Sequence, residues 1–148
     1  MKHPKVAEYL VSRLADLGVT EFFGVPGDFN FNICTAIEAS DKARWIGCCN
    51  ELNAGYAADG YARVKGVGAV VTTFGVGELS AINAVAGAYS EHVPVFKIVG
   101  SPATAVQKGQ ARIHHTLGNG DFDTFAKMYA SVTAAQTRLT AQNAAAEI

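Results

Sequence analysis

Residues 50–63 read NELNAGYAADGYAR, and this stretch decides how the chain is organised. Asn50 is a favourable N-cap residue, so the stretch predicts a helix that begins at Glu51. Small residues recur along it at three- and four-residue steps, which leaves one helix face narrow enough for another backbone to approach closely. These residues are Ala54, Ala57, Ala58 and Ala62. Glu51, in the first turn, either complements the helix dipole or is a placed functional group.

Strand-like and helix-like patterns alternate along the rest of the chain. Short apolar runs predict strands at 21–25, 44–49, 67–74 and 94–100, and a fifth strand at 131–135. Helical patterns lie at 5–17, 29–39, 78–89 and 121–128, and Thr140 is the expected N-cap of one more helix. The run at 67–74 is continuous and rich in Val and Thr, which is typical of a strand buried on both faces. We expect the strand at 44–49 to be buried as well.

This alternation predicts an α/β fold: a three-layer open parallel sheet with helices on both faces. A chain of 148 residues suits a single domain that spans residues 1–148. In such sheets the functional groups gather at the carboxyl ends of the strands. Here these ends are followed by Pro26-Gly27-Asp28, Asn50-Glu51, Gly75-Val76-Gly77 and Gly100-Ser101-Pro102.

Composition excludes several classes of partner. The net charge is −1, so nothing predicts a nucleic acid or an anionic membrane as a partner. No apolar run approaches the ~20 residues of a membrane span. No signal-peptide core follows Met1, and we therefore expect a cytoplasmic protein. Cys34, Cys48 and Cys49 are odd in number, which predicts buried, reduced thiols and no disulfide framework.

Phosphate-binding loops and metal motifs give weak matches. Gly75-x-Gly77-x-x-Ser80 lacks the third glycine of the dinucleotide fingerprint, so we expect no nucleotide site. A second candidate is a metal site made of the adjacent pair His114-His115 with the aspartates at 121 and 123. Their spacing matches no metal motif, and the sequence predicts no metal ligands.

Three isolated polar residues stay ambiguous when each is taken alone. His114 and His115 are either proton-transfer groups, because an imidazole titrates near pH ~6.5, or solvated or core side chains. Asp28 follows Pro-Gly, where an aspartate is either functional or simply forms a turn or an N-cap.

Four motifs in order resolve the ambiguity through a family resemblance. They are FGVPGD at 23–28, CNELNAGYAADGYAR at 49–63, TTFGVGELSA at 72–81 and HHTLG at 114–118. Together they closely resemble the N-terminal pyrimidine-binding domain of thiamine diphosphate-dependent 2-oxo acid decarboxylases, such as pyruvate and indolepyruvate decarboxylases. The glutamate block is shared with acetolactate-synthase-like relatives, whereas the histidine pair with Asp28 indicates the decarboxylase branch.

The resemblance implies a role for each matching residue. Glu51 would hydrogen-bond N1′ of the cofactor's aminopyrimidine and so promote loss of the thiazolium C2 proton. Such a glutamate shares a proton with a weakly basic ring nitrogen, and burial would have to oppose the effect of the helix N-terminus on its pKa. Asp28, His114 and His115 would be the acid–base groups. The lining of the aminopyrimidine pocket would be Pro26, Gly27, Thr73 and Val76.

One departure from the family is large. The family's second domain, which binds the diphosphate and Mg²⁺ through a Gly-Asp-Gly…Asn motif, has no counterpart in this sequence. In the family, the cofactor lies between this domain and the diphosphate-binding domain of a partner subunit. We therefore expect half a site, negligible activity of the isolated chain, and a homodimer or homotetramer for the intact enzyme.

The expected reaction converts a 2-oxo acid substrate, pyruvate or indolepyruvate, into an aldehyde and carbon dioxide. Two alternatives remain. The first is a non-catalytic binding or oligomerisation module of the same fold. The second is a carboligase of the acetolactate-synthase type, which would make acetolactate from pyruvate instead of an aldehyde.

Overall fold

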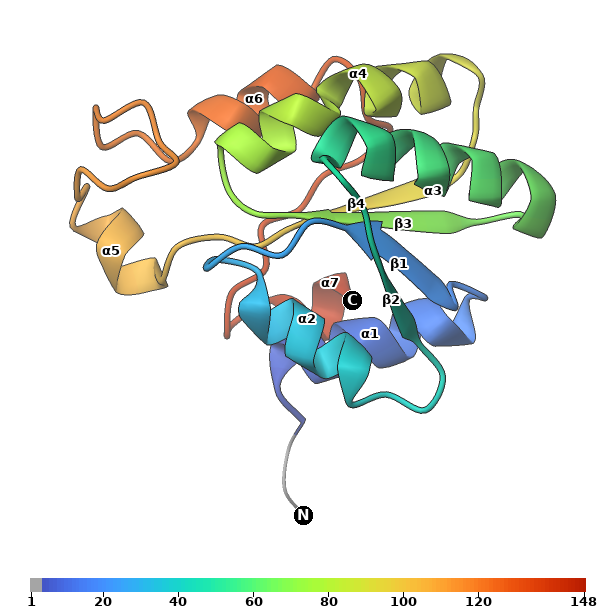
Figure 1. The fold of residues 1–148 in the computed structure, drawn as a ribbon. Helices are drawn as coiled ribbons and strands as arrows, with labels where there is room; N and C mark the ends of the chain where they lie inside the picture. Colours follow the sequence, from blue (N-terminus) through green and yellow to red (C-terminus); the bar gives the residue numbers. More distant parts are fainter. Residues whose placement is uncertain (1–3) are drawn as a thin grey trace.

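A computed structural model describes residues 4–148 and places four parallel strands side by side in the order β2-β1-β3-β4 (Figure 1). The strands are β1 (Glu21–Gly24), β2 (Arg44–Gly47), β3 (Gly68–Thr72) and β4 (Val95–Val99). Residues 1–3 lie outside the described residues. Each strand pair is in parallel register, with Phe22 opposite both Trp45 and Ala69.

Helices cover both faces of this sheet (Figure 1). They are α1 (Val6–Asp16), α2 (Phe31–Glu38), α3 (Glu51–Lys65), α4 (Val76–Ser90), α5 (Thr104–Lys108), α6 (Thr124–Tyr129) and α7 (Ala144–Glu147). Helices α1 and α2 share one apolar cluster with the sheet, whereas α3 and α4 lie on the opposite face with α6 beside α4. The predicted three-layer α/β architecture with a parallel sheet is confirmed.

The sequence predicts that both β2 and β3 are buried, but the structure buries only β3. All five residues of β3 are buried, as the Val-rich run predicts, because β3 has neighbours on both edges and helices on both faces. In β2 no residue is buried, and the expectation of a buried strand there is wrong. The reason is position: β2 is an edge strand that pairs with β1 alone.

Helix α3 has the ends that its sequence predicts. The Asn50 side chain accepts a hydrogen bond from the Asn53 amide (2.8 Å), and Gly66 ends the helix in a left-handed conformation with φ of 94°. Its small residues face α4, where a Cβ added at Gly55 would lie 2.6 Å from Cβ of Ala84. The buried set is Ala54, Gly55, Ala58 and Ala62, so Gly55 belongs to the contact face and Ala57 does not.

The C-terminal segment corrects two expectations. Residues 131–135 form turns and not a fifth strand, because the Thr133 hydroxyl donates to the Tyr129 carbonyl (2.9 Å) and so closes the end of α6. Thr140 caps a turn and not a helix: its Oγ1 accepts from the amides of Gln142 and Asn143 (both 3.3 Å). Helix α7 begins only after Asn143.

The structure also tests the predictions about the cysteines and about membrane-spanning segments. Cys34, Cys48 and Cys49 are all free thiols, as predicted. Burial was expected for all three, and this expectation is wrong: Cys34 and Cys48 are only half-buried, and Cys49 is exposed because it follows the edge strand β2. Within residues 4–148, no helix combines the length and the apolar character that crossing a bilayer requires.

Candidate active site

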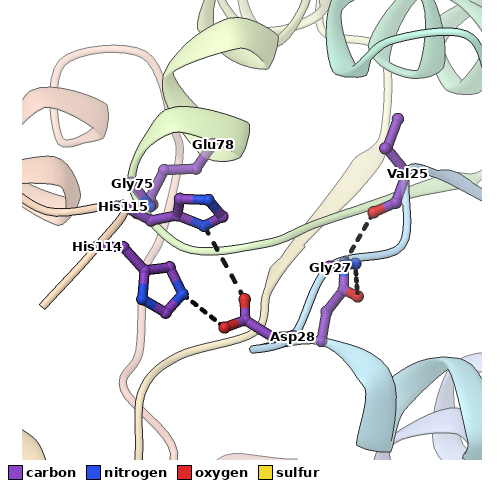
Figure 2. A network of polar contacts seen from close by, with 8 residues as sticks. Val25, Gly27, Asp28, Gly75, Glu78, His114 and His115 are labelled. Atoms are coloured by element: carbon purple, nitrogen blue, oxygen red, sulfur yellow. Dashed lines mark hydrogen bonds and ion pairs between the residues drawn. The ribbon is translucent and has the colours of Figure 1, made fainter.

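Asp28, His114 and His115 meet above the carboxyl end of the sheet, although 86 residues separate Asp28 from His114 (Figure 2). His114 Nε2 donates to Asp28 Oδ2 at 2.6 Å, and His115 Nδ1 lies 4.0 Å from Asp28 Oδ1. The side chains are 59%, 44% and 34% exposed for His114, Asp28 and His115. The structure therefore brings together all three residues that the family resemblance selects for acid–base chemistry.

A buried asparagine fixes the turn that carries Asp28. Asn30 is fully buried, and its Oδ1 accepts from the Gly27 amide (2.8 Å) while its Nδ2 donates to the Val25 carbonyl (3.0 Å). Both bonds lie within the turn between β1 and α2, so they hold the backbone on either side of Pro26 in one conformation. The sequence analysis did not single out Asn30. Its only sequence signal is a polar residue between the Pro-Gly-Asp turn and the apolar start of α2.

The histidine pair is fixed by an aromatic ring and by a glycine. The Phe29 ring stacks on His114 (centroids 5.0 Å apart, 15° between planes) and meets His115 edge-on at 6.0 Å. Gly75 has φ of 66°, and a Cβ added to it would overlap the carbonyl oxygen of His115. Only glycine lets the β3–α4 turn approach the histidine loop this closely.

The electrostatics of the cluster favour a charged carboxylate at Asp28. Desolvation raises the pKa of Asp28, but the hydrogen bond from His114 and the nearby imidazoles outweigh it, so the net pKa lies below its usual range. His115 Nδ1 is buried and has no hydrogen-bond partner. The cluster thus combines an ionised acceptor, a bonded imidazole and one imidazole nitrogen whose bonding capacity is unused.

Glu51 begins α3, and its carboxylate lies beside the turn between β3 and α4. A Cβ added at Gly77 would lie 3.1 Å from Glu51 Oε1 and 2.8 Å from Cγ2 of Thr73, and one added at Gly27 would lie 2.8 Å from Cβ of Thr73. Four of these positions therefore share one small space: Gly27, Glu51, Thr73 and Gly77. Thr73 is buried and its Oγ1 has no partner, whereas Glu51 is only partly buried in this chain.

The remaining predicted pocket residues lie at the rim. Pro26 is exposed on the turn beside Gly27, and Val76 is 56% exposed as the first residue of α4. Gly77, which the sequence analysis named only as part of a turn, lies directly beside the Glu51 carboxylate.

A buried polar network lies behind the pocket. Lys97, in the middle of β4, donates to Thr72 Oγ1 (2.6 Å), and its ammonium lies 5.5 Å from the centre of the Tyr129 ring. Glu78 is 4% exposed and its Oε1 accepts from the Gly75 amide (2.8 Å), while Tyr129 donates its hydroxyl proton to the Glu78 carbonyl. A lysine inside the apolar run at 94–100 was the sequence signal for this network.

Burial decides the charge states in this network. Lys97 is partly exposed as a residue, but protein atoms surround its ammonium closely, and this burial lowers the pKa of Lys97 to about 7 although Glu78 and Glu51 oppose the shift. Burial likewise raises the pKa of Glu78, against the Gly75 amide, Lys97 and Arg138. Attraction between the two charges would lower the pKa of Glu78 and raise that of Lys97. Both pKa values move the other way, so desolvation dominates in both groups.

The aspartates at 121 and 123 do not join the histidines. Asp123 pairs with Arg138 (2.6 Å), and Asp121 accepts from the Thr124 hydroxyl (2.8 Å) and the Asp123 amide (2.7 Å). Their carboxylates are used within the segment that leads into α6. The candidate metal site that the sequence suggested at these four residues is therefore not formed.

Comparison with known proteins gives this geometry a family. The family model described as thiamine pyrophosphate enzyme, N-terminal TPP binding domain, matches residues 4–128. The chain belongs to this family. It is 55% identical over 143 residues to an alpha-keto-acid decarboxylase of Mycobacterium ulcerans and 54% identical over 143 residues to one of Mycobacterium tuberculosis. It is 58% identical over 144 residues to a putative pyruvate decarboxylase of Schizosaccharomyces pombe.

These alignments cover 97%, 97% and 96% of this chain but 25%, 26% and 25% of the three relatives. The chain thus spans about a quarter of the length of the curated relatives that it matches. The family resemblance drawn from the four motifs is confirmed, as is the thiamine-diphosphate-binding fold. Each of these three relatives is named as a decarboxylase.

The pocket at Glu51 fits the aminopyrimidine part of thiamine diphosphate. Its three features are a carboxylate, an unpartnered buried hydroxyl on Thr73, and two glycines whose missing Cβ lets the backbone lie directly against Thr73 and Glu51. A flat, nitrogen-rich ring needs such a combination of polar partners and room for close backbone approach. Glu51, Thr73, Gly27 and Gly77 are the residues that would hold it.

Proposed function

We propose that this chain is the aminopyrimidine-binding half of a thiamine diphosphate-dependent, non-oxidative 2-oxo acid decarboxylase that converts pyruvate or indolepyruvate into an aldehyde and carbon dioxide. The observation that carries the proposal is the juxtaposition of two groups at one edge of the sheet. The Glu51 carboxylate lies against Gly77, and the Asp28 cluster lies against Gly75 two residues earlier in the same turn.

Each side chain has a distinct role in this proposal. Glu51 holds a proton shared with the aminopyrimidine ring at its carboxylate oxygen. When bound, thiamine diphosphate supplies the centre that accepts the electron pair left by departing carbon dioxide. His114 delivers or receives a proton at Nε2, and Asp28 orients that imidazole through the 2.6 Å hydrogen bond. His115 acts as the second imidazole.

The proposal places the other half of the cofactor site in a second domain. Diphosphate and Mg²⁺ would be held by a diphosphate-binding domain of a partner subunit, in a homodimer or homotetramer. Binding energy for small charged cofactors comes largely from phosphate and metal contacts. The isolated chain should therefore bind the cofactor weakly and show negligible turnover.

The first test uses the chain alone. Thiamine diphosphate with Mg²⁺ is titrated into the purified chain by calorimetry, and acetaldehyde formation from pyruvate is assayed in the same sample. We expect weak binding or none, and no acetaldehyde. Tight binding or turnover would show that the chain completes its site by itself, and the half-site proposal would be wrong.

The second test supplies the missing half. Residues 4–148 replace the matching segment of the Schizosaccharomyces pombe relative, and carbon dioxide release is measured with saturating thiamine diphosphate and Mg²⁺ for pyruvate and for indolepyruvate. We expect turnover of one of them, and a loss of at least about 100-fold in kcat for Glu51→Gln, the scale of positioned acid–base groups. Glu38→Gln, an exposed glutamate at the end of α2, is the matched control and should leave kcat unchanged.

Two further readouts separate the alternatives. Hydrogen–deuterium exchange at the cofactor's C2 should slow in Glu51→Gln by a similar factor, and unchanged exchange would remove the proposed role of Glu51. Product analysis with pyruvate distinguishes acetaldehyde from acetolactate. A folded, cofactor-loaded chimera that makes neither product would mean that this domain is a non-catalytic module.

A further inference from the structure

We propose that Asp28, His114 and His115 form a binding site for a divalent transition-metal ion of the zinc class, independent of the Mg²⁺ that accompanies thiamine diphosphate. Two imidazoles and one carboxylate are a donor set that suits Zn²⁺ and Co²⁺, whereas Mg²⁺ and Ca²⁺ prefer oxygen ligands. Each of the three residues offers one ligand atom, and these atoms all lie within 4.8 Å of one another (Figure 2).

The distances leave only a small adjustment to reach coordination. Ligands of one tetrahedral zinc ion, with bonds of about 2.0–2.1 Å, lie about 3.3 Å apart. His114 Nε2 lies 2.6 Å from Asp28 Oδ2 and His115 Nδ1 lies 4.0 Å from the other oxygen, Oδ1, so the first contact has to open by about 0.7 Å and the second has to close by about 0.7 Å. The three ligand atoms lie within 4.8 Å of one another, so no pair has to close by more than about 1.5 Å, which side-chain rotations supply.

A second observation points to a ligand at this position. His115 Nδ1 is buried without a hydrogen-bond partner, whereas buried polar side-chain atoms of proteins in general nearly always have one. It faces Asp28, so an ion between them would satisfy it. Solvent can still reach the cluster, because the Asp28 and His114 side chains are 44% and 59% exposed, and this leaves a path for entry and an open coordination position.

The neighbouring residues hold the ligands in place. Phe29 stacks on the His114 imidazole and meets His115 edge-on, and the Gly75 turn packs against the His115 backbone. Asn30 fixes the turn that carries Asp28. Rings and carboxylates that are already oriented lose less freedom on binding an ion than mobile surface side chains do.

A bound ion would occupy the atoms that the proposed acid–base chemistry needs. In a complete enzyme, we expect transition-metal ions of the zinc class at micromolar concentrations to inhibit activity, and a chelator to restore it. The binding proposal itself does not depend on decarboxylase activity, because the ligands and the test belong to this chain alone. Failure of one proposal therefore leaves the other to be decided by its own experiment.

The test is a titration of the purified chain with ZnCl₂ by calorimetry at fixed pH, with CoCl₂ absorption spectra recorded in parallel. We expect one ion per chain and visible Co²⁺ bands of the intensity of a four- or five-coordinate site. Asp28→Asn, His114→Gln and His115→Gln should each weaken binding by at least about tenfold, since even outer partners of metal ligands are worth 10–100-fold.

Matched controls remove the two other histidines and the exposed cysteine one at a time. His92→Asn alters a histidine outside the cluster, and Cys49→Ser removes an exposed thiol. His3→Gln alters a histidine that lies outside the described residues. All three should keep the wild-type affinity. Binding that survives in the three cluster variants, or that is lost in any control variant alone, would overturn the proposal.

A measurement on the wild-type chain covers the case in which a cluster variant fails to fold. Modification of histidines by diethylpyrocarbonate is followed residue by residue by mass spectrometry, with and without Zn²⁺. Zn²⁺ should slow modification of His114 and His115 and leave that of His92 unchanged. Equal rates with and without the ion would overturn the proposal.

Discussion

Single buried side chains decide the geometry of this site more than the reactive groups themselves do. Asp28 and His114 are well exposed, and their contact depends on the residues beneath them. Asn30 is the clearest case, because one fully buried amide satisfies a donor on Gly27 and an acceptor on Val25. A reactive pair on a surface needs such an internal support to keep a 2.6 Å contact.

Asn30→Ala should lower the free energy of unfolding by about 2–3 kcal/mol, because it leaves a backbone donor and a backbone acceptor unpaired in a buried turn. Urea denaturation followed by circular dichroism measures the loss. Asn32→Ala, at an exposed position of α2, is the matched control and should change the stability by less than about 0.5 kcal/mol. Equal effects of the two substitutions would contradict the role assigned to Asn30.

Lys97 gives the molecule a defined pH dependence of stability. Its pKa falls from 10.5 to about 7 on folding, so between these values the unfolded chain holds one more proton than the folded chain. The free energy of unfolding of the wild type must then rise with pH across this window, relative to a variant without the amine. The groups that face the ammonium are Glu78, Glu51 and Tyr129, and burial raises the pKa of Tyr129 so that it stays protonated.

Lys97→Met should abolish this dependence. We expect the stability difference between the wild type and Lys97→Met to shift by about 1–3 kcal/mol in favour of the wild type from pH 7 to pH 10, since one pKa unit corresponds to about 1.4 kcal/mol. Urea denaturation across the pH range measures it. Lys65→Met removes an exposed lysine at the end of α3 and should follow the wild type. A wild-type curve parallel to that of Lys97→Met would refute the buried-amine assignment.

At the scale of elements, the contact between α3 and α4 sets the distance between the two halves of the site. Glu51 begins α3, and α4 begins with the turn that holds Gly75 and Gly77. The two helices approach closely because glycine and alanine line both sides. Any added volume at this contact moves the Glu51 carboxylate relative to that turn.

Gly55→Ala tests this contact against a control in the same helix. A Cβ at Gly55 would lie 2.6 Å from Cβ of Ala84, so we expect a net loss of stability of about 1–3 kcal/mol from overpacking. A Cβ at Gly60 meets nothing within 4 Å, and Gly60→Ala should stabilise the protein by about 0.5–1 kcal/mol through helix propensity. Thermal and urea denaturation measure both, and effects of the same sign would contradict this packing.

At the scale of the whole molecule, α6 in the C-terminal part of the chain packs against the residues that support His114 and His115. Phe125 of α6 is 1% exposed and packs against the Phe74 ring with centroids 5.3 Å apart. Phe74 directly precedes Gly75, which contacts the His115 backbone. Residues far apart in sequence are thus joined in one apolar cluster under the site.

Phe125→Ala should cost about 3–5 kcal/mol, the usual price of truncating a buried phenylalanine. The matched control is Met128→Ala in the same helix, where the side chain is 45% exposed and the loss should stay below about 1 kcal/mol. Urea denaturation gives both values. Near-ultraviolet circular dichroism of Phe125→Ala should also change, because the packing of Phe74 and Phe29 changes with it, and an unaltered spectrum would show that the cluster is not shared.

Several elements of the fold could be predicted because their determinants are local. Alternating apolar runs, the Asn50 cap and the Gly66 stop act over a few residues, and the periods of strand and helix follow from backbone geometry. The errors fall where the outcome depends on distant partners. The burial of β2 depends on which strand lies beside it, and residues 131–135 became turns because they close α6.

The site divides in the same way. The motifs alone were enough to select Glu51, Asp28, His114 and His115, because the family resemblance rests on short stretches of unusual composition. The supporting residues left weak signals, since Asn30, Phe29 and Lys97 are ordinary residue types whose roles arise only from what packs against them.

The sequence by itself determined the α/β class, the order of its elements, the family and the identity of the candidate reactive groups. Only the tertiary structure decided that Asp28 pairs with His114, that the aspartates at 121 and 123 do not, and that Lys97 lies in a buried network. The physical reason is the range of the interactions. Helix caps and strand periods are set by neighbours along the chain, whereas burial, ion pairing and ligand geometry depend on contacts that exist only once the chain has folded.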